Sequence, residues 1–473
     1  MKTTPTNNRT RFTPTRSHNQ KKNDDKFDVV SDRSTHAEPR GSARAEPRRS
    51  ARAEPRRSAR AEPRRSARAE PRRSILHLDL DTFFVSCERI LDSRLNDRPV
   101  LIGGLSDRGV VAACSYEARR FGIRSAMPMK LARQLCPEAV VIRGNSGTYS
   151  KFSDMVTEII KEYAPSYEKA SIDEFYVDMS GMDAYFGCLK YATEMRQKII
   201  HETHLPISFG LSINKTVSKI ATGIAKPNNQ LKIDKGLEKP FLSPLPVRKI
   251  PMVGAKTHQM LCHLGVKVIG TIQDMPREMM ESVFGKNGTM IWKKAQGIDN
   301  TPVIPYHERK SISTERTFDR DTIDVKRLKS LITAMAENLA FQLRRGMKLS
   351  GCITVKIRYS DFQTQTLQCR VPYTSADHII VPKVKELFDR LYNRRVLVRL
   401  VGVRFSHLVG GHYQMDMFED SQEIISLYQA MDRIRERYGD RAVMRAEGIE
   451  ARTIGRMNPF TGEPPPLLAH RHQ

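Results

Sequence analysis

The stretch LHLDLDTFFVSCE, which begins at Leu76, constrains the fold more than any other part of the sequence. Successive side chains of a strand point to opposite faces, so one face of this strand carries Leu76, Leu78 and Leu80. The other face carries His77, Asp79 and Asp81, and two phenylalanines follow at once. The leucines predict a strand that is buried on one side. Two carboxylates at the end of such a strand are unusual for a structural element and indicate a functional site.

Charge and composition narrow the class of partner. The 473-residue chain carries a formal net charge of +26, which is typical of a protein that binds a polyanion such as nucleic acid. No apolar run approaches the ~18 residues of a membrane span, and the N-terminus lacks the apolar segment of a secretory signal. The seven cysteines are scattered without a CxxC pair, which argues against a zinc site or a disulfide framework. We therefore expect a cytoplasmic protein without a membrane partner.

Residues 1–74 form a separate basic region. From Arg40 onward they contain an eight-residue repeat, RSARAEPR in one phase, with a proline in every copy. Regular prolines prevent a continuous helix and large apolar residues are nearly absent, so we expect a disordered arm. Its 21 Lys/Arg exceed its 9 Asp/Glu by 12, which leaves more than half of the net charge on the rest of the chain. The arm is either an electrostatic tether for nucleic acid or a tandem expansion without a role.

From Ile75 onward the sequence predicts an α+β protein with several domains. Up to about residue 240, the expected strands are 75–81, 99–102, 140–142, SIDEFYVDM and LPISFGLSI, and the expected helices are 149–163, 187–203 and one that ends at Pro227. Short helices, broken by Gly and Pro, follow to residue 305. After them we expect strands between 311 and 410, and helices at 325–345, 376–391 and 420–438.

A second acidic element, SIDE, precedes the strand FYVDM. Its Asp173 and Glu174 could join Asp79 in a cluster of three carboxylates, which repels itself unless cations neutralise it. Oxygen ligands in this number suit Mg²⁺, and two such ions clamp the attacking and leaving oxygens of a phosphoryl transfer. The alternative is a pair of unrelated, solvated strand ends.

A lysine-bearing helix follows the strand LPISFGLSI. Asn214 is placed to cap this helix. At about 100° per residue, one helix face carries Lys215, Lys219 and Lys226. The apolar residues on the opposite side are Val217, Ile220, Ala221 and Ile224. Lysines beside an acidic cluster suit a nucleoside triphosphate, whereas the alternative is an ordinary solvated face.

Two further patterns indicate phosphate binding. In YEARRFGIRSAMPM, Tyr116, Arg119 and Arg120 share one helix face, where arginine can hold phosphate through two hydrogen bonds. In KIPMVGAKTHQMLCHLGV, a tight turn at Val253 and Gly254 opens a helix, as in a helix-hairpin-helix whose backbone N–H groups hold a DNA phosphate. The alternatives are an ordinary surface helix and a plain helical hairpin.

The motifs LDLDTFFVSCE, SYEARRFGIRSAMP, SIDEFYVD, NKTVSKIATGIAKPN and IPMVGAKT resemble, in order and spacing, those of Y-family translesion DNA polymerases of the DinB type. The resemblance covers about residues 75–420. It implies a right-hand polymerase with a ferredoxin-like palm, small fingers, a helical thumb that contains the helix-hairpin-helix, and an α/β little finger. The implied domains are the palm at 75–84 and 145–240, the fingers at 85–144, the thumb at 241–310, the little finger at 311–410 and a tail at 411–473.

The resemblance also implies roles for individual residues. The implied ligands of two Mg²⁺ ions are Asp79, the Leu80 carbonyl, Asp173 and Glu174. The residues implied on the triphosphate of the incoming dNTP are Tyr116, Arg119 and Lys226. The residues implied on the DNA are Val253, Gly254 and Lys256.

Phe84 matches the steric gate of the family, a ring that leaves no room for the 2′-hydroxyl of a ribonucleotide. Phe83 is expected to pack in the core, and Asp81 stands beside the carboxylate cluster without being a usual ligand. The chain departs from the family at Met252, where IPGVG is usual, and at Ala113, where many members carry a small hydroxyl residue. The first departure puts the backbone geometry of the thumb hairpin in question, and the second removes one contact near the triphosphate.

The segment QMDMF, after the last expected strand, resembles the peptide by which bacterial polymerases dock on the sliding clamp. Gln414 would hydrogen-bond to the clamp, and Met417 and Phe418 would fill an apolar pocket. The alternative is an ordinary strand end. The expected partners are therefore primer-template DNA, dNTPs and the clamp, and the polymerase is expected to be a monomer in the bacterial cytoplasm.

The expected function is error-prone, DNA-directed DNA synthesis across lesions. A nucleotide passes from dNTP to the primer 3′-hydroxyl by two-metal catalysis, without proofreading. One alternative is a catalytically silent, DNA-binding scaffold of the same family, which should have lost a carboxylate. Another is a nucleotidyl cyclase, which would need neither the thumb hairpin nor the clamp peptide. Primer extension separates the three.

Overall fold

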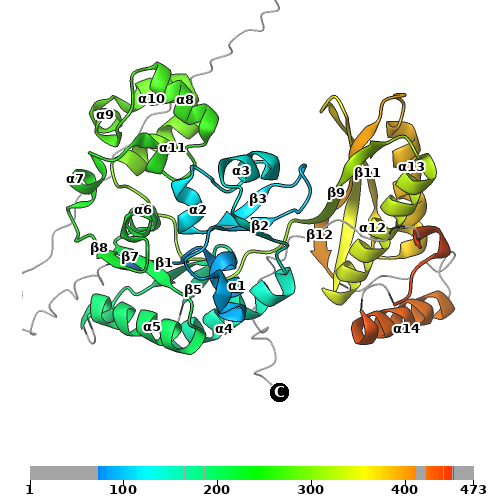
Figure 1. The fold of residues 1–473 in the computed structure, drawn as a ribbon, viewed down its shortest axis with the longest axis horizontal. Coiled ribbons are helices and arrows are strands. Elements are labelled where there is room, and N and C mark those ends of the chain that lie inside the picture. Colours follow the sequence, from blue (N-terminus) through cyan, green and yellow to red (C-terminus); the bar gives the residue numbers. More distant parts are fainter. Residues whose placement is uncertain are drawn as a thin grey trace, which may run out of the picture. The chain divides into compact units, whose positions relative to one another are not determined.

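The computed structural model describes residues 73–164, 166–184, 187–411, 422–439, 442–449 and 451 (Figure 1). The chain divides into Met1–Arg68 and Ala69–Gln473, and every described residue belongs to the second part. The repeat of the expected arm and the QMDMF segment both lie outside the described residues.

A five-stranded sheet of order β5-β6-β1-β7-β8 carries the acidic motifs. Its strands are β1 (Ile75–Leu80), β5 (Tyr167–Lys169), β6 (Glu174–Asp178), β7 (Ile207–Ser212) and β8 (Gln230–Lys232). Helices α4 (Ser146–Tyr163) and α5 (Cys188–Thr203) cover one face, and α6 (Lys215–Ala225) covers the other (Figure 1). Because β1 is the central strand and is antiparallel to both β6 and β7, this is the ferredoxin-like arrangement expected for a palm.

Strand β1 is buried on both faces, which the alternating pattern did not predict. Leu76, Leu78 and Leu80 pack in the core with residues of α4 and α5, as expected. On the other face His77 is fully buried, and its Nδ1 lies 2.8 Å from Oγ1 of Thr222 in α6. Burial, and then the charges of two nearby lysines, hold the pKa of His77 well below its usual value, so the ring is neutral.

A second, smaller core surrounds a three-stranded sheet of order β3-β2-β4. Its strands are β2 (Val100–Gly103), β3 (Val111–Cys114) and β4 (Val140–Ile142). The flanking helices are α1 (Phe83–Leu91), α2 (Tyr116–Arg120), α3 (Met129–Leu135) and a 3₁₀ turn at Ser93–Leu95. Helix α2 begins after Ser115, whose hydroxyl oxygen accepts from the Ala118 N–H at 3.2 Å.

Short helices build a third core. They are α7 (Glu238–Leu242), α8 (Ala255–His263), α9 (Ile269–Asp274), α10 (Arg277–Phe284), α11 (Lys286–Ala295) and a 3₁₀ turn at Val247–Lys249. Val217, Ile220 and Ala221 of α6 pack into the same core. Helix α6 therefore connects these helices to the five-stranded sheet.

The fourth core lies between an antiparallel sheet of order β11-β10-β12-β9 and two helices. The strands are β9 (Ser311–Thr322), β10 (Lys348–Tyr359), β11 (Thr364–Thr374) and β12 (Val398–Gly410). The helices are α12 (Val325–Arg345) and α13 (Asp377–Leu391). This is the α/β composition expected of a little finger, although the boundaries of all the domains stay a prediction.

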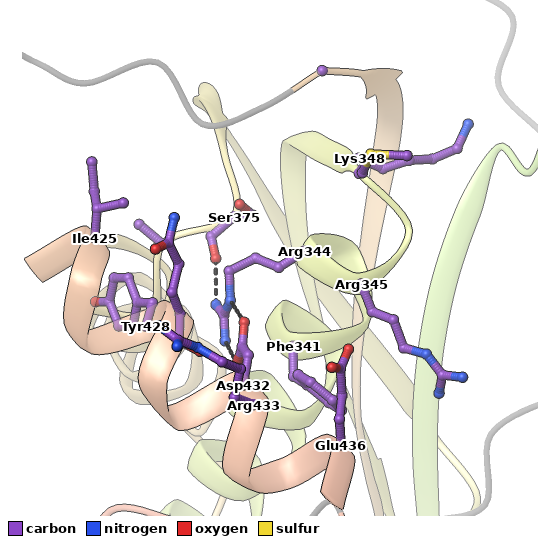
Figure 2. Close-up of a pocket in the computed structure, with 14 residues that line it drawn as sticks. Phe341, Arg344, Arg345, Lys348, Ser375, Ile425, Tyr428, Asp432, Arg433 and Glu436 are labelled. Atoms are coloured by element: carbon purple, nitrogen blue, oxygen red, sulfur yellow. Dashed lines mark hydrogen bonds and ion pairs between the residues drawn. The ribbon is translucent and has the colours of Figure 1, made fainter.

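A last helix, α14 (Gln422–Tyr438), packs against α12. Figure 2 shows Arg344 of α12 between Ser375 and Asp432, in the wall of a pocket of 470 Å³. Its guanidinium donates to the Ser375 carbonyl at 2.8 Å and to Asp432 at 2.6 Å, and it also bonds Asp377 at 2.8 Å. A 3₁₀ turn at Ala446–Gly448 follows, and another at Met182–Ala184 follows β6.

Within the described ranges, no helix is long and apolar enough to cross a membrane.

Candidate active site

The two acidic motifs meet at one end of the five-stranded sheet. Asp79 lies directly opposite Glu174 in the antiparallel pair of β1 and β6, and Leu80 donates its N–H to the Asp173 carbonyl at 3.0 Å. Opposed residues of such a pair have Cβ atoms about 5 Å apart, and like charges there are destabilising. The fold therefore brings the two acidic motifs together at one end of the sheet, and their like charges need positive charge nearby.

Two lysines supply positive charge in this structure. Lys219 Nζ lies 2.5 Å from Glu174 Oε2, and Lys226 Nζ bonds Asp79 Oδ1. Burial raises the pKa of Asp79 to about 6. Lys226 opposes this rise, whereas the negative charges of Glu174 and Asp173 add to it. The site thus favours a cation beside Asp79.

The third carboxylate, Asp173, accepts from the Ser171 hydroxyl. Among the described residues, no three His, Cys, Asp or Glu side chains converge as a ready-made metal site. The donor set is nonetheless of the type that Mg²⁺ prefers, since it consists of carboxylate oxygens on adjacent strand ends. Metal binding here therefore remains a prediction.

Asp81 has a role that sequence reasoning missed. It is 1% exposed, and its Oδ2 accepts from the Ser208 hydroxyl at 2.8 Å and from the Asn228 N–H at 2.6 Å. Its Oδ1 lies 3.6 Å from Lys226 Nζ. Asp81 thus fixes the loop after α6 and places Lys226 beside Asp79. The only sequence signal was its position two residues after Asp79, on the same strand face.

The lysines of the predicted face of α6 contact different carboxylates. Lys219 and Lys226 reach the carboxylates, whereas Lys215 is 8% exposed and bonds Glu168 at 2.5 Å, so it cannot face a triphosphate there. Ile224, which was predicted on the apolar side, is 39% exposed. Asn214 does cap the helix, because its Oδ1 accepts from the backbone N–H three residues on, at 3.0 Å.

Tyr116 and Arg119 lie on one face of α2, as the sequence predicted. The Arg119 guanidinium carbon is 4.9 Å from the centre of the Tyr116 ring. Burial, and then the charge of Asp81, raise the pKa of Tyr116 to about 12. The Tyr116 hydroxyl is buried beside the Asp81 carboxylate, and a side-chain hydrogen bond between the two contributes to this rise.

The two phenylalanines after β1 differ in their surroundings. Phe83 is 3% exposed and belongs to the main core. Phe84 is half-buried and stacks on Tyr149, with the ring centres 4.5 Å apart and the planes at 19°. The Tyr149 hydroxyl donates to Glu88 at 2.6 Å, which holds this second ring in place. The Phe84 ring is therefore supported by a second ring and is partly exposed, and its role as a steric gate stays a prediction.

The predicted hairpin opens at the start of α8. Val253 is buried, while Gly254 and Lys256 are exposed. A hollow of 420 Å³ at this turn is lined by Arg248, Val253, Gly254, Ala255 and His258. The first N–H groups of a helix have no partner within the helix, so those of α8 are placed for an anion.

Met252, in the position where the family has glycine, adopts φ = 78° and is 70% exposed. The left-handed region costs a side chain about 1–2 kcal/mol, which exceeds the entropic cost of glycine in the unfolded chain. We expect Met252→Gly to raise the free energy of unfolding of the helical region by about 1 kcal/mol, measured by urea denaturation. The matched control, Met279→Gly in α10, should lower it by a similar amount. A lower free energy of unfolding for Met252→Gly would contradict backbone strain at Met252.

Comparisons with known proteins agree with the geometry. The impB/mucB/samB family model matches residues 78–223, and the model of that family's C-terminal domain matches residues 309–417. The chain is 36% identical over 369 residues to a DNA polymerase IV of Dehalococcoides mccartyi (strain CBDB1), covering 77% of this chain and 95% of the relative. A DNA polymerase IV of Desulfatibacillum aliphaticivorans is 34% identical over 377 residues, covering 78% and 95%.

A third relative, a DNA polymerase IV of Yersinia pestis (strain Pestoides F), is 37% identical over 339 residues, covering 71% of this chain and 96% of its own. Among solved structures, a Y-family DNA polymerase chimera, Dbh-Dpo4(243-245)-Dbh, matches with a TM-score of 0.64 and 25% identity, covering 72% of this chain and all of that one. Fold and site thus define the Y-family class of polymerases. Within that class the chain belongs to the impB/mucB/samB family and is of the DinB type.

Proposed function

We propose that this chain is a DNA-directed DNA polymerase that acts in translesion synthesis. The observation that carries the proposal is the register that sets Asp79 opposite Glu174, with Asp173 adjacent and lysines in contact with both strands. The relatives, all named DNA polymerase IV, support the same activity.

The three carboxylates and the Leu80 carbonyl would hold two Mg²⁺ ions. Bound there, the ions supply activation of the primer 3′-hydroxyl and neutralisation of charge on the phosphates. Because Lys226 already bonds a carboxylate of the site, it is within reach of a triphosphate beside that carboxylate. Tyr116 and Arg119 would bind the same triphosphate from α2, with the Tyr116 hydroxyl as a donor.

Phe84 would act as the steric gate, since its ring is supported by Tyr149. The hairpin at Val253, Gly254 and Lys256 would hold a DNA phosphate without reading bases. With fingers of only about 60 residues and no second acidic set for an exonuclease, we expect slow, distributive and error-prone synthesis in the bacterial cytoplasm by a monomer.

Two other functions fit less well. A catalytically silent scaffold would not need the three carboxylates, whereas this chain retains all three of them. A nucleotidyl cyclase needs neither a helical hairpin nor a second α/β core whose sheet carries basic residues on its outer face.

The proposal is tested by extension of a labelled primer on undamaged and damaged templates. We expect Mg²⁺-dependent extension that a chelator abolishes, synthesis past at least one lesion, and no shortening of the primer in the absence of dNTPs. Failure to extend any primer would reject the proposal, and intrinsic 3′→5′ excision would reject its error-prone character.

DNA affinity should depend steeply on salt. The outer faces of β10 and β11 carry Lys356, Arg358 and Arg370, opposite the strand faces that pack on α12 and α13. Arg370 is exposed, whereas Lys356 pairs with Glu315. The logarithm of the binding constant should fall by roughly 0.9 per log unit of salt concentration for each phosphate neutralised. Arg370→Ala should remove one such contact and reduce the slope by about 0.9. Affinity that is independent of salt would contradict this picture.

Clamp binding should depend on QMDMF. Replacing Met417 and Phe418 by alanine removes the apolar anchors, so it should abolish stimulation by a loaded sliding clamp and leave clamp-free extension unchanged. Met415→Ala, in the same segment, is the matched control. Full stimulation of the double variant would place the docking site elsewhere.

A further inference from the structure

The segment that leaves α11, residues 297–304, binds the first turn of α6; we call it the exit segment. Asn214 Nδ2 donates to the Gly297 carbonyl at 2.8 Å. The Thr216 hydroxyl and N–H donate to Asp299 Oδ2 at 2.7 and 3.2 Å, and Asp299 Oδ1 accepts from the Thr301 N–H at 3.0 Å. A carboxylate from another part of the chain thus caps a helix that has unsatisfied N–H groups and a positive end.

Electrostatics agree with this capping role. Burial raises the pKa of Asp299, but the hydrogen bonds from Thr216 and Thr301 outweigh it, and the pKa of the carboxyl is lowered. Asp299 is therefore charged at neutral pH. Arg73, just before β1, donates to the Asp299 carbonyl at 2.8 Å and holds the same residue from the other side.

A buried ion pair makes the second attachment. Glu168 Oε2 accepts from Lys215 Nζ at 2.5 Å and from the Ile304 N–H at 2.7 Å. Glu168 and Lys215 are 9% and 8% exposed, and Lys215 also lies 4.9 Å from the centre of the Tyr176 ring. Exposed ion pairs contribute little to stability. Removing one partner of a buried pair leaves an uncompensated buried charge, so the loss of either Glu168 or Lys215 should be strongly destabilising.

Both attachments act on the helix that sets Lys219 and Lys226 beside the carboxylates. Lys219 lies one helical turn after Lys215 and bonds Glu174, and Lys226 follows the end of the helix and bonds Asp79. A helix moves as a unit, so a change at its first turn displaces Lys219. We propose that Asp299 and the Glu168–Lys215 pair are positioning residues, through which the exit segment sets α6 against the carboxylate cluster.

This inference rests on the proposed polymerase function only for its kinetic consequence. Asp299→Ala in the full chain should lower kcat for single-nucleotide insertion by about tenfold or more, since misplacement by 1 Å can cost a hundredfold. The primer-template Kd should stay at its wild-type value. Amide exchange from Lys219 to Ala225 should become about tenfold faster without DNA or metal. Asn300→Ala, an exposed neighbour, is the matched control and should match the wild type in all three measurements.

Thr216→Val tests the same contact from the helix side, because it removes only the hydroxyl donor, and it serves if Asp299→Ala does not fold. The double variant should be no worse than Asp299→Ala alone if both act through one bond. Faster exchange confined to Lys215–Val217 with a normal kcat would overturn the inference, as would a lower kcat with unchanged exchange. If the wild-type chain extends no primer, the proposed function fails, and exchange across α6 still decides whether Asp299 positions it.

Discussion

Replacing Asp173 or Glu174 by alanine should lower nucleotide incorporation by about a thousandfold or more, because the lost carboxylate is one that would hold the metal ions. Binding of primer-template DNA should change little, since the residues that we propose for DNA binding lie on other elements. Rates of single-nucleotide insertion and equilibrium DNA binding measure the two effects separately. Glu174→Ala also leaves Lys219 without its partner at 2.5 Å, so this variant tests the register of β1 and β6 directly.

Glu194→Ala is the matched control, because this glutamate is exposed on α5 and lies outside both acidic motifs. It should insert nucleotides at the wild-type rate. Normal insertion by both Asp173→Ala and Glu174→Ala would reject the assignment of the active site.

Replacing Phe84 by alanine should relax sugar selection by about a hundredfold, which is the discrimination that a single apolar contact typically provides. The ring is half-buried, stacks on Tyr149 and packs at the margin of the main core, so its removal should open space on the exposed side of the ring. Use of deoxynucleotides should change little. Insertion of ribonucleotides and deoxynucleotides opposite the same template base gives the ratio.

Phe83→Leu is the neighbouring control. Phe83 is 3% exposed, so this variant should lose stability while it retains sugar selection. If Phe83→Leu accepts ribonucleotides and Phe84→Ala does not, the gate lies one residue earlier than we assign it.

Local signals located the longer elements, whereas the short strands β3, β5 and β8 were not predicted. Helix α12 spans the predicted 325–345, because Asp324 caps it by accepting from the Arg327 N–H and Gly346 follows its last residue. Helix α4 was expected at 149–163 but begins at Ser146, because the Asn145 side chain caps it by accepting from the Gly147 N–H at 3.1 Å. The capping residue was visible in the sequence, and the prediction overlooked it.

The site was predictable where its residues form short motifs and not where partners come from distant segments. Asp79, Asp173 and Glu174 stand at strand ends, where antiparallel pairing brings them together. By contrast, the burial of Lys215 depends on Glu168, 47 residues earlier in the chain. Periodicity assigns a lysine to a helix face, but it cannot show that a distant segment places a buried carboxylate against that face.

The same limit explains His77 and Asp81, which the alternation placed on a polar strand face. Both are buried, because α6 supplies Thr222 to the first, and the loop after it supplies the Asn228 N–H to the second. A polar residue can be buried wherever a hydrogen-bond partner exists, and the sequence of one strand does not reveal that partner.

The most direct test of the account is single-nucleotide insertion by the full chain with Mg²⁺ on four primer-templates that differ only in the templating base. We predict that the dNTP inserted most efficiently is the complementary one on each template, with measurable misinsertion of the others. Insertion of the same nucleotide on all four templates, or none on any, would contradict a template-directed polymerase with its active site at Asp79, Asp173 and Glu174.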